Sequence, residues 1–205
     1  HGDIGDIWFG EDSVVKMVQW VESEYPDFDT RIIDVGCGNG HLLLELAELG
    51  YTSLTGIDYS AQAIDLASTI AKQRLPEPAS VAYRSLNLLD PSEVEQLIAS
   101  TSTPTSSSQW DLALDKGTFD AISLADGSSE ATQDPKRQYV EAICDLLQDN
   151  GTLLITSCNW TQEELVKLFQ PNLVYRDHVN HPSFKFGGAV GQTVCTVAFT
   201  KVSSG

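Results

Sequence analysis

The residues of the chain that most suggest chemistry are three glycines at alternate positions, preceded by an acid. They occur in the stretch DVGCGNG, which lies between two apolar runs. A glycine-rich turn between a buried strand and a helix is typical of a nucleotide site, because glycine lets the backbone approach a ligand closely. The sequence therefore predicts a ligand site formed by Asp34, Gly36, Cys37, Gly38, Asn39 and Gly40.

The acid before the first glycine indicates which ligand binds. A dinucleotide fingerprint would place its third glycine at His41, and Asp34 would repel a pyrophosphate. An ammonium or a sulfonium group would be attracted, and S-adenosylmethionine carries both. Eighteen residues after Gly40, Asp58 ends the next apolar run, where its carboxylate can accept hydrogen bonds from both ribose hydroxyls. We expect S-adenosylmethionine as cofactor, with Tyr59 beside it. The alternative is a tight turn in another kind of nucleotide enzyme.

The stretch SLNLLD is expected beside the adenine. The side-chain oxygen of Asn87 can accept a hydrogen bond from the adenine amino group, and Asp90 is the alternative acceptor. Leu88 and Leu89 offer an apolar wall for the ring. A purely local role for Asn87, capping a turn, is the competing interpretation.

Asp115 is the candidate on the reacting side of the ligand. It ends another apolar run, in LALDKGTFDAISL, where the transferable methyl group would face its acceptor. A charge at the end of a buried strand is costly without partners. Capping of the following helix, or pairing with Lys116, is the alternative.

Strands that alternate with helices must position these residues. Predicted strands occupy 31–35, 53–58, 80–88, 110–115 and 152–159, and predicted helices occupy 13–25, 41–50, 60–75, 91–100, 134–151 and 161–169. Two last strands, 173–179 and 193–201, form a hairpin around a glycine-rich loop, 183–192. The pattern predicts an α/β fold with a mostly parallel, Rossmann-like sheet, a C-terminal antiparallel hairpin and helices on both faces. Ligands bind at the carboxyl ends of the strands in such sheets.

Composition limits the classes of partner and environment. The 205 residues suit a single domain over 1–205, with a flexible Ser/Thr loop at 101–109. Twelve basic and 29 acidic residues give a net charge of −17, which disfavours nucleic acid and either attracts a basic partner or merely solubilises the chain. No cysteine pair or cysteine–histidine spacing suits a metal, and no apolar run suits a membrane span. We expect no metal, no membrane and a soluble, cytoplasmic protein.

Several longer motifs are similar to those of one family. The stretches GDIGDIWFGEDS, DVGCGNGHLLLELAELG, LTGIDYS, LDKGTFDAISL, ITSCNWTQEEL and KFGGAVGQTV resemble the Efm4-type lysine methyltransferases of eukaryotic elongation factor 1-alpha. The glycine turn with its two acids resembles the wider class I, seven-stranded methyltransferases. The resemblance implies transfer of a methyl group from S-adenosylmethionine to one lysine of elongation factor 1-alpha, with S-adenosylhomocysteine as product.

The resemblance also implies roles for further residues. The segment 1–12, with Trp8 and Phe9, closes over the cofactor as a lid. The chemistry of a lysine acceptor, rather than the resemblance, suggests that Asp115 and the backbone carbonyls of SCNW, including Asn159, orient the amine. Trp160 would flank the stem of the lysine unless it only packs at a helix start. The enzyme is expected to be a monomer. A small-molecule or arginine methyltransferase on the same fold, or an inactive cofactor-binding scaffold, are the alternatives.

Overall fold

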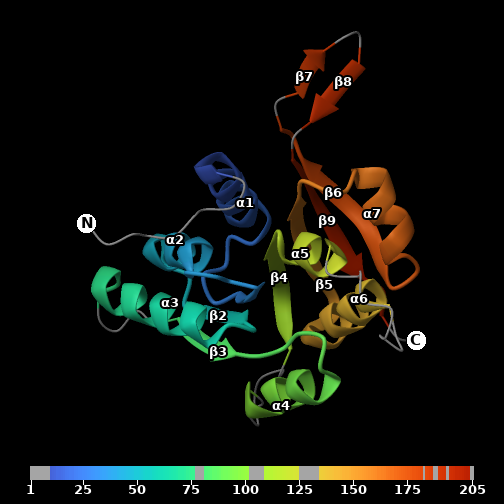
Figure 1. The fold of residues 1–205 in the computed structure, drawn as a ribbon. Helices are drawn as coiled ribbons and strands as arrows, with labels where there is room; N and C mark the ends of the chain where they lie inside the picture. Colours follow the sequence, from blue (N-terminus) through green and yellow to red (C-terminus); the bar gives the residue numbers. More distant parts are fainter. Residues whose placement is uncertain are drawn as a thin grey trace.

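A seven-stranded sheet in the order β3-β2-β1-β4-β5-β9-β6 organises the computed structural model (Figure 1). β9 is antiparallel to β5 and β6, and the remaining neighbours are parallel. The structure describes residues 10–76, 81–101, 109–124, 134–181, 183–186, 189–192 and 194–203. The strands are β1 (Arg31–Val35), β2 (Ser53–Asp58), β3 (Ala82–Ser85), β4 (Trp110–Lys116), β5 (Leu147–Ser157), β6 (Leu173–Val179) and β9 (Cys195–Lys201).

Helices cover both faces of this sheet, as predicted (Figure 1). Alternate side chains of a buried parallel strand point to opposite faces. Ile32 of β1 therefore lies in the apolar cluster beneath α1 and α2, whereas Ile33 lies in the cluster beneath the helices from α4 to α7. The helices are α1 (Gly10–Glu24), α2 (His41–Leu49), α3 (Ala61–Arg74), α4 (Pro91–Thr101), α5 (Thr118–Leu124), α6 (Pro135–Leu146) and α7 (Gln162–Phe169).

The predicted fold class is confirmed, and several element bounds are corrected. α1 begins at Gly10, so Ser13 lies inside the helix rather than at its N-cap, and the helix takes the last residues of the predicted lid segment. The helix predicted over 134–151 ends at Leu146, because Leu147 already pairs with Trp110 in the sheet. β3 is shorter than the predicted strand 80–88.

The glycine-rich loop predicted at 183–192 is the other correction. It contains two short strands, β7 (Ser183–Phe186) and β8 (Ala189–Gln192), which pair with each other antiparallel. Each strand has only four residues, and glycines lie between the two strands and within β8, so the sequence carries no clear strand pattern there.

Residues in and just after β6 hold α1 against this edge strand. Trp20 donates its indole N–H to Asp177 at 3.3 Å, and Lys16 donates to the carbonyl oxygen of Asn180 at 2.6 Å. Arg176 forms an ion pair with Glu24 at 2.8 Å. These contacts link α1 to the edge strand β6 on the far side of the sheet.

No helix among the described residues is long and apolar enough to cross a membrane. In the same residues, no group of three or more His, Cys, Asp or Glu side chains is arranged to hold a metal ion.

Candidate active site

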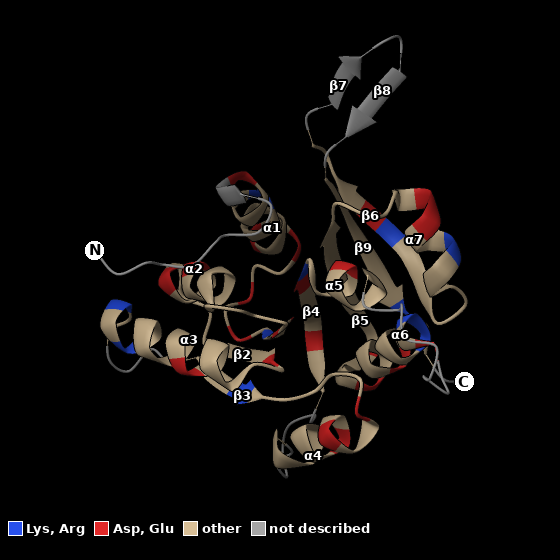
Figure 2. Ribbon diagram, viewed as in Figure 1, with Lys and Arg blue, Asp and Glu red and all other residues tan. Residues whose placement is uncertain are grey.

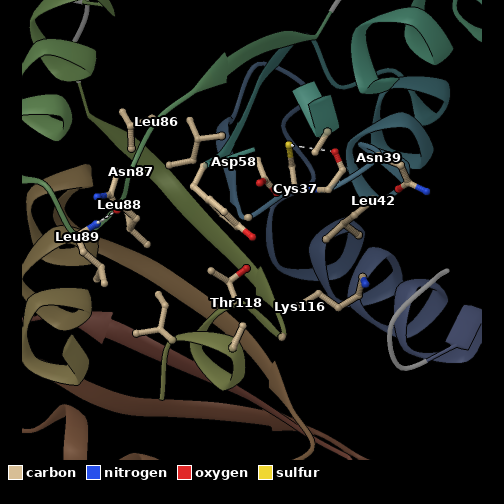
Figure 3. A pocket seen from close by; sticks show the side chains of 18 of the residues that line it. Cys37, Asn39, Leu42, Asp58, Leu86, Asn87, Leu88, Leu89, Lys116 and Thr118 are labelled. Carbon is tan, nitrogen blue, oxygen red and sulfur yellow. Dashed lines mark hydrogen bonds between the residues drawn. The ribbon is translucent and has the colours of Figure 1, made fainter. Parts of the chain in front are cut away.

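A cavity of about 700 Å³ lies at the carboxyl ends of β1, β2, β3 and β4 (Figure 3). This is the edge at which a ligand was expected, and the volume is in the range of small-molecule sites. The turn after β1 forms one wall, the segment after β3 another, and the first turn of α5 a third. The predicted cofactor residues that line the cavity are Gly36, Cys37, Gly38, Asn39, Asp58, Tyr59, Asn87 and Leu88.

The turn after β1 presents backbone to this cavity. Gly38 has a φ of 54°, and a Cβ built there would meet nothing within 4 Å. A ligand can therefore approach bare backbone at Gly38. Gly36 needs its glycine for another reason, because a Cβ there would lie 1.9 Å from Oγ1 of Thr118 on α5. Gly40 does not line the cavity; it is the N-cap of α2.

Asp58 joins the end of β2 to the glycine turn. Its Oδ2 accepts a hydrogen bond from the backbone N–H of Gly38, and its Oδ1 accepts one from Ser60, both at 2.9 Å. A carboxylate has about four acceptor positions, so the two used here leave capacity for two hydroxyl donors in the cavity. The geometry fits the expected contact with a ribose.

Asp34 lies behind the cavity wall rather than on it. It is 3% exposed in β1, and burial raises its pKa from 3.8 to about 7. The charge of Lys116 opposes this shift, whereas Asp115 and Asp58 add to it. Lys116 itself lines the cavity, and burial lowers its pKa. The carboxylate of Asp34 can act on a cationic ligand through its charge, without lining the cavity.

The segment after β3 separates the two candidates for the adenine contact. Asn87 lines the cavity, although its Oδ1 also accepts a hydrogen bond from the N–H of Leu89 at 3.1 Å. Asp90 does not line the cavity; its Oδ1 accepts from the backbone and hydroxyl of Ser92 at 2.9 and 2.7 Å. These hydrogen bonds lower the pKa of Asp90. The position favours Asn87, with Leu86, Leu88 and Leu89 as the apolar wall.

The contacts of Asp115 agree with the alternative in which it caps the following helix, α5. It is fully buried, and it accepts hydrogen bonds from the N–H groups of Thr118 and Phe119 at 2.8 and 3.0 Å and from the hydroxyl of Tyr139 at 2.6 Å. Burial raises its pKa to about 7, against the effect of these donors. The carboxylate is absent from the cavity lining, where Gly117 and Thr118 stand instead. Its contacts therefore do not support the expected contact with the reacting groups.

Trp160 and Asn159 follow β5 and also lie outside the cavity lining. The Trp160 indole N–H donates to Oγ of Ser123 at 3.1 Å, and its ring centroid is 5.6 Å from that of Phe119. These contacts agree with the alternative in which Trp160 only packs at the start of a helix. Asn159 is exposed. The expected lid residues Trp8 and Phe9 fall outside the described residues.

Three residues that bear on the site and its surroundings were not given these roles from the sequence: Thr118, Lys116 and Asp120, of which Asp120 does not line the cavity. Thr118 and Lys116 both line the cavity, and Lys116 had been considered only as a partner of Asp115. Asp120, 1% exposed on α5, contacts the end of β5. All three belong to the stretch DKGTFD. Its second acid, five residues after Asp115, is the feature of the sequence that could have drawn attention to this segment.

Comparison with known proteins agrees with this geometry. Residues 26–195 match a family described as a methyltransferase domain. The fold is similar to magnesium protoporphyrin IX methyltransferase from Synechocystis, solved with bound S-adenosylmethionine, at a TM-score of 0.65 and 13% identity, covering 98% of this chain and 86% of that one. The sheet order, the glycine turn and this match define an S-adenosylmethionine-dependent methyltransferase.

Two relatives that match almost the whole of this chain define the family more narrowly. The chain is 37% identical to EEF1A lysine methyltransferase 2 of Homo sapiens, over 98% of this chain and 78% of that protein. It is 38% identical to protein-lysine N-methyltransferase efm4 of Schizosaccharomyces pombe, over 96% of this chain and 84% of that protein. The chain belongs to the family of these EEF1A lysine methyltransferase 2 and Efm4 proteins.

Proposed function

We propose that the protein methylates a lysine of elongation factor 1-alpha. The observation that carries the proposal is the similarity over at least 96% of the chain to five relatives at 35–38% identity. Three of them are named for lysine methylation of EEF1A and two as protein-lysine N-methyltransferases. The cavity adds a place for the cofactor of that reaction.

Residues on the cavity wall would hold the cofactor. The backbone around Gly38 would meet its amino-acid part, Asp58 would accept from the ribose hydroxyls, and Asn87 would contact the adenine beside leucine side chains. The buried carboxylate of Asp34 supplies negative charge behind the turn. When bound, S-adenosylmethionine supplies an electrophilic methyl group on a positively charged sulfur. The unfilled acceptor positions of Asp58 and the open space at Gly38 fit this ligand.

The acceptor lysine must be neutral before its nitrogen can attack. At pH 7, removing the proton from an amine with a pKa of about 10.4 costs roughly 4.6 kcal/mol. Asp115 does not reach the cavity, so it is not placed to receive that proton. The contribution of the chain is to align the amine and to exclude water, with proton release to solvent.

The overall charge suits a basic protein substrate. Figure 2 shows Asp and Glu positions, coloured red on the ribbon, in helices from both faces of the sheet, including α1, α4 and α7. With a net charge of −17, the surface attracts a basic partner and repels phosphate backbones. The charge thus favours a protein substrate over nucleic acid, and the proposal further takes the enzyme to be monomeric and cytoplasmic, without a membrane partner.

Transfer of a labelled methyl group tests the proposal directly. The full chain is incubated with labelled S-adenosylmethionine and one acceptor at a time. The acceptors are intact elongation factor 1-alpha, a short peptide around the labelled lysine, free arginine and small amines. Label on one lysine of the intact factor is the expected result. Label only on arginine or small molecules would favour the alternative methyltransferases, and cofactor binding without transfer to any acceptor or cell extract would favour a scaffold.

A further inference from the structure

A second buried carboxylate on α5, Asp120, connects that helix to the end of β5. It is 1% exposed, its Oδ1 accepts a hydrogen bond from Oγ of Ser157 at 2.5 Å, and its Oδ2 accepts one from the N–H of Cys158 at 2.9 Å. The two segments are 37 residues apart in the chain. Both oxygens of Asp120 therefore hold the segment in which β5 ends.

Ser157 passes this restraint on to the next residues. Its Oγ accepts hydrogen bonds from the N–H groups of Asn159 and Trp160 at 3.1 and 3.0 Å, so both of its lone pairs are used. The carbonyl oxygen of Trp160 accepts from the thiol of Cys195 on β9 at 2.9 Å. We call residues 157–160 the β5 loop.

The β5 loop lies on the far side of α5 from the cavity. Thr118, Ala121 and Ile122 of α5 line the cavity, whereas Asp120 and Ser123 contact the β5 loop. β5 is also the neighbour of β4 on the side away from β1, so its carboxyl end continues the edge at which the cavity opens. Cys158 and Asn159 are exposed there. A macromolecule that reaches the cavity past β4 meets these residues.

We propose that Asp120 is a positioning residue that sets the backbone of the β5 loop against the methyl acceptor. The proposal rests on the proposed function, since it takes the acceptor to be a lysine on a folded protein. Stability alone is a poor reason for this arrangement, because a buried carboxylate is costly and apolar packing would hold the segment as well. The carboxyl group is useful because its two oxygens accept from two donors and so fix one loop conformation.

The variant Asp120→Asn tests the proposal with almost no change in size. In one orientation its amide N–H₂ faces the N–H of Cys158, which is also a donor. In the other it faces Oγ of Ser157, whose lone pairs are already used. Either way one hydrogen bond is lost and the β5 loop is released, whereas the cavity side of α5 is untouched.

Hydrogen exchange gives a readout that does not depend on any substrate. We expect amide exchange in residues 157–161 to become at least about tenfold faster in Asp120→Asn, with no change in 41–49 on the cavity side of the glycine turn. Tyr51→Phe is the matched control. It removes a buried hydroxyl that donates to the carbonyl oxygen of Tyr25 at 2.7 Å, in the apolar cluster on the other face of the sheet from the β5 loop. Unchanged exchange in 157–161 would overturn the proposal whatever the substrate is.

Kinetics with intact elongation factor 1-alpha test whether the position of the β5 loop affects methyl transfer. Asp120→Asn is expected to keep its cofactor Kd within about threefold and to lose at least about tenfold in kcat/KM for the protein substrate. Ser157→Ala should show the same pattern. The kcat/KM of the double variant should be no lower than that of the less active single variant, because both substitutions act through one loop. A multiplied loss in the double variant, or a parallel loss of cofactor affinity, would indicate a general structural role and would overturn it.

The two proposals fail in different ways. If the wild-type chain transfers no label to any lysine, the proposed function fails, and the exchange measurement still decides whether Asp120 holds the β5 loop. If the wild-type chain methylates the factor and Asp120→Asn does so equally well, only the positioning role fails.

Discussion

The side-chain hydroxyl of Thr118 donates a hydrogen bond of 2.7 Å to the carbonyl oxygen of Val35, at the last residue of β1. Gly36, the next residue, packs so closely on the same side chain that a Cβ would overlap Oγ1. The glycine turn and the start of α5 therefore form one continuous piece of the cavity wall. A change in either part is expected to change how the cofactor is held.

Replacing Thr118 by Val removes this hydrogen bond at nearly constant shape. The carbonyl oxygen of Val35 loses its partner from α5, so we expect cofactor binding to weaken by about 1 kcal/mol, roughly fivefold. Calorimetry on the full chain measures this. Thr69→Val is the control, because Thr69 makes a similar hydroxyl contact of 2.8 Å to Asp65 on an exposed part of α3. Equal affinities in the two variants would contradict the prediction.

Gly38→Val and Asp58→Ala should each weaken S-adenosylmethionine binding by at least about tenfold, roughly 1.4 kcal/mol. The valine would fill the open space at Gly38 and strain a backbone with φ of 54°, and the alanine would remove the ribose acceptor. Gly50→Ala is the control for strain alone. Gly50 also has a positive φ of 111°, but it caps the other end of α2, away from the cavity lining. Unchanged affinity in both site variants, with intact folding, would disprove the cofactor assignment.

Asp34→Asn should stabilise the unliganded protein at neutral pH and weaken cofactor binding. Because the pKa of Asp34 is raised to about 7, the folded state binds more protons than the unfolded state between about pH 4 and pH 7. Its carboxylate therefore costs stability as the pH rises through this range. The surrounding charges are Lys116, Asp115 and Asp58.

We expect the amide at position 34 to raise the free energy of unfolding by about 1–4 kcal/mol at pH 8 and by much less at pH 4. Thermal melts across this range measure the effect, and calorimetry with the cofactor measures the loss of affinity. A variant that is less stable than wild type at pH 8 would show that attraction to Lys116 outweighs the cost of burial.

Asp115→Ala is expected to destabilise the chain by at least about 2 kcal/mol, because it leaves two backbone N–H groups and the Tyr139 hydroxyl without their acceptor. Tyr139→Phe removes only one of these hydrogen bonds and should cost about 1 kcal/mol. Since the start of α5 moves in Asp115→Ala, cofactor affinity and methyl transfer should fall together. Normal cofactor affinity with lost transfer would instead support direct contact of Asp115 with the acceptor.

Salt should slow methylation of a basic protein substrate. Screening shortens from roughly 14 Å at 0.05 M to about 4 Å at 0.5 M, so attraction between a surface of charge −17 and a basic factor is largely removed. We expect kcat/KM for the intact factor to fall over this range, with a much smaller change for a neutral acceptor peptide. A rate that does not depend on salt would assign the acidic surface a solubilising role only.

Local patterns in the sequence singled out several of the residues that line the cavity. The turn after β1 and the acid at the end of β2 depend on residues next to each other in the chain, so their spacing is visible before folding. The strand–helix alternation likewise defined the sheet edge at which they meet. What these patterns do not contain is the direction in which a buried side chain points.

Asp115 shows this limit. Its carboxylate turns toward α5 and away from the cavity because Tyr139, 24 residues further on, donates a short hydrogen bond to it from α6. The same holds for Leu147, whose pairing with Trp110 ends α6 early, although the helical pattern continues. Tertiary partners decide both cases, and no local spacing encodes them.

The attachment of α1 to β6 has a consequence for synthesis of the chain. Trp20 and Asp177 are 157 residues apart, so at about 5–20 residues per second roughly 8–31 s separate their appearance at the ribosome. Met17 and Val21 of the same helix are fully buried in the finished protein, in a cluster that includes Ala198 of β9. Helix α1 is therefore made well before the strands that bury it, and a nascent chain that has not yet reached β9 still exposes its apolar face.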